Sequence, residues 1–123
     1  MMKKIFIAGS RKFHEEINYL VSKLKTHKIN ATLPNKDKNI ENDNLENQKI
    51  AILDAFKKID EADAIYVYSK EGYIGKTVAM EIAYAHAKKK EIIAREEIKE
   101  LSAQALITKQ LNEEELIQHC QKI

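Results

Sequence analysis

DAIYVYSKEGYIGKTVAMEIAYAHAKKKEII, residues 63–93, is the most informative stretch of this sequence. β-branched and aromatic residues at 64–68 predict a buried strand, which a glycine-containing loop connects to a helix over residues 77–89. Ile92 and Ile93 then predict another short strand. Parallel strands need such helical crossovers, and open α/β sheets bind ligands at the carboxyl ends of their strands. Glu81, near the start of the helix, is therefore the first candidate functional residue.

The residues before this stretch predict two more strand–helix units. Short apolar or alternating runs indicate strands, and apolar residues at helical spacing indicate amphipathic helices. Pro34 stops the second strand, and the polar segment that follows predicts a mobile loop. The predicted elements are strands over 3–8 and 29–33, helices over 14–28 and 45–59, and a loop over 35–44.

The residues after the stretch are less regular. Residues 98–101 predict a helical turn, and the apolar residues 105–107 predict a brief fifth strand. Asn112 and Glu115 have the spacing of a capping box, which predicts the start of a final helix.

The alternation of strands and helices predicts an α/β fold. We expect one doubly wound domain over residues 1–123, flavodoxin-like or Rossmann-like, because 123 residues is an ordinary domain length. The parallel sheet should have four to five strands in the order 2-1-3-4-5.

Composition argues against several functional classes. No apolar run is long enough for a membrane span or a signal peptide, so we expect a cytoplasmic protein without a membrane partner. A net charge of +2, with acids mixed among the bases, does not favour binding to a nucleic acid polymer. One cysteine and four scattered histidines do not have the spacing of a metal site.

The loop GYIGKT ends like a P-loop but lacks its first glycine, since Lys70 stands there. Gly75, Lys76 and Thr77 could still bind an anion, because glycine permits close approach and the first N–H groups of a helix attract phosphate. The alternative is that the glycines only permit a tight loop.

A second loop with suitable residues for phosphate follows the first strand. In the predicted strand order, Gly9, Ser10 and Arg11 share a crevice with the GYIGKT loop. The alternative for Ser10 is that its side chain only caps the following helix.

Three segments together resemble a known family. IFIAGSRKF, DEADAIYVYS and above all GKTVAMEIAYAHAKKKEII look like the nucleoside 2-deoxyribosyltransferase family and its relatives that hydrolyse the N-glycosidic bond of deoxynucleoside monophosphates. The similarity covers about residues 3–93. It implies a small doubly wound α/β domain, no cofactor, and a homodimer or higher homo-oligomer.

The resemblance also implies roles for individual residues. Glu81 would be the nucleophile that attacks C1′ of the sugar, and its place near a helix N-terminus would help to keep it charged. Asp54 would assist the leaving base or orient the sugar. Tyr73, like Tyr66 and Tyr68, could stack on the base or supply a hydroxyl, and the alternative is that the strand tyrosines only pack in the core. Phe6 stands where the family commonly has a tyrosine that hydrogen-bonds the nucleophile.

We therefore predict cleavage of the N-glycosidic bond of a nucleoside or nucleoside 5′-monophosphate, by hydrolysis or by transfer to another base. The alternative is a non-catalytic nucleotide-binding or regulatory module on the same fold, in which Phe6 and the one-residue displacement of Asp54 mark the loss of chemistry. Both readings have a small nucleoside or nucleotide as the ligand, and neither specifies the base or the type of sugar.

Overall fold

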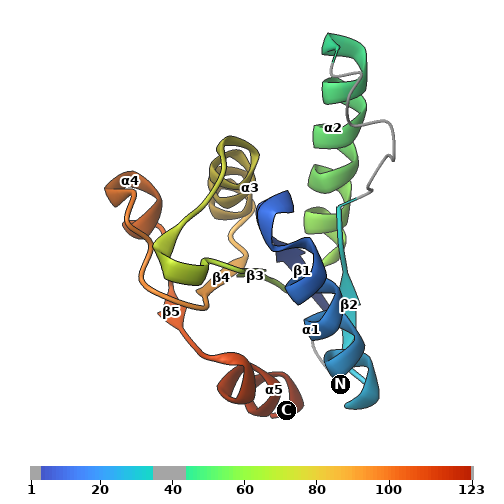
Figure 1. Cartoon of the computed structure of the whole chain (residues 1–123), viewed down its shortest axis with the longest axis vertical. Coiled ribbons are helices and arrows are strands. Elements are labelled where there is room, and N and C mark those ends of the chain that lie inside the picture. The colour runs from blue at the N-terminus through green and yellow to red at the C-terminus, as the bar shows by residue number, and fades with distance from the viewer. Residues whose placement is uncertain (1–3, 35–43, 123) are drawn as a thin grey trace.

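A computed structural model describes residues 4–34 and 44–122 of the chain. Within these residues, five strands form one parallel sheet in the order β2-β1-β3-β4-β5 (Figure 1). The predicted loop over 35–44 lies outside the described residues except for Asn44, which caps the next helix. The predicted fold class and strand order are confirmed. The strands are β1 (Lys4–Ala8), β2 (Asn30–Thr32), β3 (Ala64–Val67), β4 (Glu91–Ala94) and β5 (Lys109–Gln110).

Helices cover both faces of the sheet. Residues of α1 and α5 pack with one face in one apolar cluster, and residues of α2, α3 and α4 pack with the other face in a second cluster. Parallel strands are buried on both faces in this way, which is why β3 is apolar at every position. The helices are α1 (His14–Thr26), α2 (Leu45–Glu61), α3 (Lys76–Ala87), α4 (Leu101–Gln104) and α5 (Glu113–Gln121), and two 3-10 turns are η1 (Arg11–Phe13) and η2 (Lys70–Gly72).

The last third of the chain differs from the prediction in one element. The predicted fifth strand over 105–107 is wrong, because these residues form the turn that ends α4. The N–H groups of Leu106 and Ile107 donate to carbonyls of α4, and both side chains pack against the second apolar cluster. The edge strand β5 follows instead at two exposed polar residues. The partly buried Leu106 and Ile107 therefore pack at the end of a helix and do not form a strand.

The final helix begins as predicted. Asn112 Oδ1 accepts from the backbone N–H of Glu115 at 2.8 Å, and Glu115 Oε1 accepts from the N–H of Asn112 at 2.9 Å. This reciprocal pair satisfies two N–H groups that the helix itself leaves free.

No helix in the described part of the chain has the length and apolar character to cross a bilayer.

Strand register brings two loops to one edge of the sheet. β1 pairs with β3 so that Ala8 lies opposite Val67, and the N–H of Tyr68 donates to the carbonyl of Ala8 at 2.7 Å. Both strands therefore end at the same level. The loop that starts at Gly9 and the segment that leads from β3 to α3 leave this edge together, at the point where the strand order reverses.

Candidate active site

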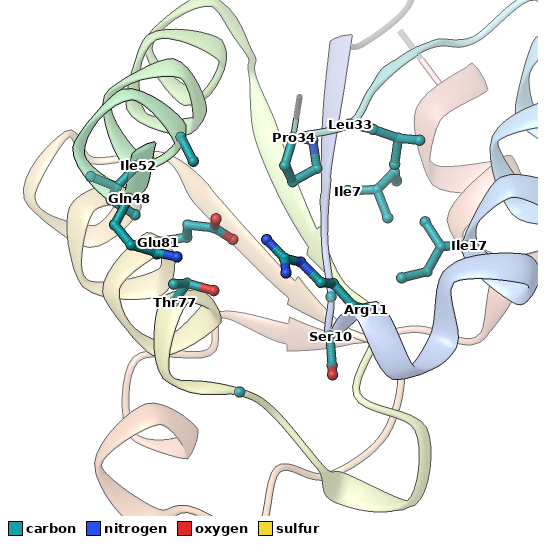
Figure 2. A pocket seen from close by; sticks show the side chains of 13 residues that line it. Ile7, Ser10, Arg11, Ile17, Leu33, Pro34, Gln48, Ile52, Thr77 and Glu81 are labelled. Carbon is teal, nitrogen blue, oxygen red and sulfur yellow. The ribbon is translucent and has the colours of Figure 1, made fainter. Parts of the chain in front are cut away.

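A cavity of about 330 Å³ opens at the carboxyl end of β1. The loop after β1, the segment after β2, the α2 helix and the first turns of α3 all contribute to its walls. Its position is the one that the strand order predicts for a ligand site. The lining residues are Ile7, Gly9, Ser10, Arg11, Ile17, Leu33, Pro34, Gln48, Ala51, Ile52, Gly75, Thr77 and Glu81 (Figure 2).

Glu81 is the buried carboxylic acid of this cavity. Glu81 is only 4% exposed, and its Oε1 atom has no hydrogen-bond partner among the described residues. Burial raises the pKa of Glu81 to about 8. A buried polar atom without a partner is costly, and such atoms gather at sites that bind a ligand or perform chemistry.

The expectation that the helix N-terminus keeps Glu81 charged is wrong. α3 begins at Lys76, so Glu81 lies in its second turn, whereas the stabilisation of an anion by a helix is confined to the first turn. Loss of water around the carboxylate is the larger effect, and it favours the neutral acid.

Arg11 supplies a cation to the same cavity. Figure 2 shows its guanidinium pointing toward the carboxyl group of Glu81 from the opposite wall. No ion pair joins the two side chains in residues 4–34 and 44–122, and within that part of the chain the guanidinium has no other partner. Because an arginine presents five donors in a planar fork, a free one facing a cavity is suited to bind a phosphate or carboxylate group.

Ser10 and Thr77 line the cavity from two different turns. The hydroxyl of Ser10 accepts from the backbone N–H of Lys12 at 3.3 Å, so the predicted capping role is confirmed, although the element it caps is η1. Thr77 is exposed in the first turn of α3, where free N–H groups of the helix begin.

The glycines of the α3 loop differ in what they require. Gly72 has a φ of +78°, and a Cβ there would lie 2.8 Å from the carbonyl oxygen of Glu97, so the fold itself demands glycine. Gly75 has an ordinary φ of −88°, and a Cβ there would meet nothing within 4 Å. Gly75 therefore leaves open space at the cavity wall that packing does not explain.

Three predicted site residues do not line the cavity. Asp54 is half-buried and pairs with Lys58 at 3.0 Å along α2. Lys76 is exposed at the start of α3 but is absent from the lining residues. Tyr73 packs edge-on against Phe13, with ring centroids 6.2 Å apart, next to a separate surface depression.

Neither Tyr66 nor Tyr68 directs its hydroxyl toward the side of the sheet on which α3 carries Glu81. Tyr66 and Tyr68 point to the face of the sheet covered by α1 and α5, where their hydroxyls donate to Leu111 O and to Glu16. Phe6 lies on the other face, fully buried in the cluster that contains α3 residues.

Thr32 is the register partner of Phe6 and has its own unsatisfied hydroxyl. Register partners in neighbouring strands direct their side chains to the same face of the sheet. Oγ1 of Thr32 is buried without a hydrogen-bond partner in the described residues, as is Oε1 of Glu81. The face of the sheet that Phe6 occupies therefore includes a buried hydroxyl without a hydrogen-bond partner among the described residues.

The walls contributed by α2 and by the segment after β2 were not predicted from the sequence. Gln48 and Ile52 are four residues apart on α2, and Leu33 and Pro34 follow β2 directly. The helical spacing of 48, 51 and 52 was a usable signal, because a face that mixes a polar amide with apolar residues differs from a core face.

Metal ligands are not grouped in the part of the chain that the structure describes. Within it, no three side chains of histidine, cysteine, aspartate or glutamate come together as a metal site requires. The cavity itself is lined by one carboxyl group, one guanidinium, one amide and two hydroxyls. This set is suited to bind a polar organic molecule and to perform acid–base or nucleophilic chemistry on it.

Comparisons with known proteins establish the fold. No family model matches the chain, and no curated protein matches it in sequence. A conserved protein from Enterococcus faecalis V583 has a similar structure, with a TM-score of 0.73 and 23% identity over 96% of each chain. The CMP N-glycosidase BcmB of Clostridium botulinum has a TM-score of 0.59 and 17% identity, over 95% of this chain and 96% of its own. At these identities, the class that is shown is a Rossmann-like α/β fold.

Proposed function

We propose that the protein cleaves the N-glycosidic bond of a nucleoside 5′-monophosphate, with Glu81 as the nucleophile. The observation that carries this proposal is the cavity in which a buried Glu81 faces Arg11, where neither the Oε1 atom of Glu81 nor the guanidinium has a partner among the described residues. The resemblance of the sequence around Glu81 to deoxyribosyltransferases supports it. The fold shared with a CMP N-glycosidase supports the same class of reaction.

The chemistry follows from an ionised Glu81. A carboxylate oxygen attacks C1′ of the sugar, the bond from C1′ to the base nitrogen breaks, and its electron pair leaves with the base, which takes up a proton. Water then attacks C1′ of the resulting glycosyl ester, which releases the sugar phosphate and regenerates Glu81. If another base attacks in place of water, the outcome is transfer. Hydrolysis therefore requires that water enters the cavity after the base has left.

The raised pKa limits how much of the protein is ready to react. With a pKa of about 8, Glu81 is mostly the neutral acid at pH 7. Only about a tenth of the molecules then hold the carboxylate. The rate of base release should therefore increase with pH up to about the pKa of Glu81. A proton-donating role for Glu81 would give the opposite slope.

The experiment that tests the proposal is a panel of nucleosides and their 5′-monophosphates incubated with the protein. Free base is separated by chromatography and quantified over time. We expect base release from at least one monophosphate, faster than from the matching nucleoside. Binding of a monophosphate without any base release would instead support the alternative of a nucleotide-binding module.

Arg11→Ala is expected to weaken binding of a monophosphate at least about tenfold more than binding of the corresponding nucleoside. A charge-assisted hydrogen bond to phosphate contributes about 1.5–3 kcal/mol, and the nucleoside lacks that group. Lys76→Ala is the matched control. Lys76, at the start of α3, is also positively charged, but it does not line the cavity. Calorimetric titration of each variant with both ligands measures the difference. Equal losses for the two ligands would show that Arg11 does not recognise phosphate.

The alternative of a non-catalytic module rests on Phe6, which removes the hydroxyl that the family places beside its nucleophile. Phe6→Tyr tests it. If the added hydroxyl donates to the Glu81 carboxylate, it lowers the pKa of Glu81, so the pH midpoint of base release decreases and the rate at pH 7 increases about tenfold. A pH–rate profile of both proteins measures this. If the hydroxyl finds no partner, the variant loses about 1–3 kcal/mol of stability and stays inactive, which would favour the module.

A further inference from the structure

A surface depression lies next to the cavity, and the proposed reaction gives its residues no role. Its volume is about 430 Å³, a size common among ligand pockets. The loop from β3 to α3 and the segment after β4 form most of its wall. These two segments are joined where the N–H of Lys99 donates to the carbonyl of Gly72 at 3.1 Å, beside α4 (Figure 1).

The GYIGKT loop is divided between the cavity and the depression. Its second half, with Gly75, lines the cavity, whereas its first half, with Gly72 and Tyr73, lines the depression. The turn η1 is divided in the same way, since Arg11 lines the cavity and Lys12 lines the depression. The two hollows are therefore neighbours that share two segments of the chain.

The positive charges of the depression are available to a ligand, whereas its negative charges are engaged by the fold. Neither Lys12 nor Lys99 has an ion pair or a side-chain hydrogen bond within the described residues. Of the two carboxylates, Glu100 accepts from a backbone N–H of α4 at 2.7 Å and so caps that helix. Glu71 interacts electrostatically with Lys70. The depression is therefore suited to bind an anion.

Tyr73 presents an aromatic ring to the same depression. The residue is 44% exposed, and Phe13 packs edge-on against its ring with centroids 6.2 Å apart. Nζ of Lys12 lies 4.4 Å from the centroid of the Tyr73 ring, a cation–π distance. An exposed ring beside a cation is a common arrangement for a nucleotide, because the base stacks on the ring while the cation binds phosphate.

Glycine at position 72 brings the second cation to the ring. Gly72 has a φ of +78°, and a Cβ there would lie 2.8 Å from Cγ of Lys99. The aliphatic part of Lys99 therefore lies against Gly72, directly before Tyr73 in the chain. The two lysines thus reach the depression from different segments, Lys99 against Gly72 and Lys12 against the Tyr73 ring.

We propose that this depression is a second ligand site, which binds a nucleotide with its base on Tyr73 and its phosphate between Lys12 and Lys99. The site is distinct from the cavity, because Tyr73 and Lys99 do not line the cavity, and Glu81 and Arg11 do not line the depression. The proposal does not depend on the reaction that the cavity performs. Since Lys12 follows Arg11 in η1, a nucleotide in the depression would contact the turn that carries Arg11.

The test follows backbone amides by NMR while Glu81→Gln, which should not cleave nucleotides, is titrated with adenosine 5′-monophosphate. We expect saturable shifts at the amides of Gly72, Tyr73 and Lys99. Adding Lys99→Ala should weaken this binding about tenfold or more, because a charge-assisted contact to phosphate is lost. Adding Arg11→Ala should leave binding at these amides within about twofold, which separates the depression from the cavity.

Two further titrations test the ring and the specificity for a nucleotide. Tyr73→Leu keeps an apolar side chain against Phe13 but removes the ring, so adenosine 5′-monophosphate should bind about fivefold or more weakly and inorganic phosphate equally well. Lys25→Ala and Tyr19→Leu, both at exposed positions of α1 outside the depression, are the matched controls and should change neither affinity.

Four results would each overturn the proposal. The first is the absence of shifts at the three amides, and the second is binding there that Lys99→Ala does not weaken. The third is loss of the shifts in Arg11→Ala, which would assign them to the cavity. The fourth is inorganic phosphate bound as tightly as adenosine 5′-monophosphate, which would leave the Tyr73 ring without a role.

Discussion

Glu81→Gln should reduce the rate of base release by about 10⁴-fold or more while the fold is retained. The amide is nearly the same size as the acid, but it cannot form a glycosyl ester with C1′. The loss should appear in kcat, because covalent attack occurs after the substrate is bound. Affinity for the monophosphate should change little, since Arg11 and the backbone at Gly75 remain in place at the cavity wall.

Glu15→Gln is a suitable control for this variant. It makes the same chemical change at an exposed position of α1, on the far face of the sheet. We expect it to retain the wild-type rate. If Glu81→Gln retained turnover within tenfold of the wild type, Glu81 would have no part in the covalent step.

Glu81→Gln is also expected to change how the stability of the protein depends on pH. Burial raises the pKa of Glu81 to about 8 in the folded protein, whereas a glutamate in an unfolded chain has a pKa of about 4.3. Between these two values the folded state keeps a proton that the unfolded state has released. The free energy of unfolding of the wild type therefore decreases as the pH increases through this window.

This contribution should amount to about 3 kcal/mol between pH 5 and pH 8. Glutamine does not titrate, so the variant lacks the decrease and gains stability relative to the wild type as the pH increases. Urea unfolding of both proteins at several pH values measures the difference. Curves that stay parallel from pH 5 to pH 8 would contradict the raised pKa. A nucleophile that lowers stability near its working pH is a common cost of an active site.

Much of the fold could be predicted because the decisive signals are local and repeated. Periodic apolar residues defined the helices, the crossovers implied a parallel sheet, and the strand order was the usual one of flavodoxin-like sheets. The error over 105–107 arose because three consecutive apolar residues fit a buried strand and a packed helix end equally well. Only the tertiary contacts of Leu106 and Ile107 distinguish the two.

The candidate site was predictable in outline only. The switch-point rule directed attention to the loop after β1 and to the segment that leads into α3, and residues of both line the cavity. The sequence did not predict which side chains point into the cavity. Thr77 lines the cavity, whereas its neighbour Lys76 does not. The raised pKa of Glu81 could not be predicted from the sequence either, because it depends on how much water the surrounding residues exclude.

Glu81 as the nucleophile is tested most directly by stopping the reaction with acid during turnover of a monophosphate and measuring the intact mass of the protein. We predict an increase equal to the mass of the sugar phosphate group. Peptide mapping should place this group on Glu81, and the Glu81→Gln variant should show no increase. Base release by the wild type with the group attached to a different residue, or attached equally well in the variant, would contradict the central claim.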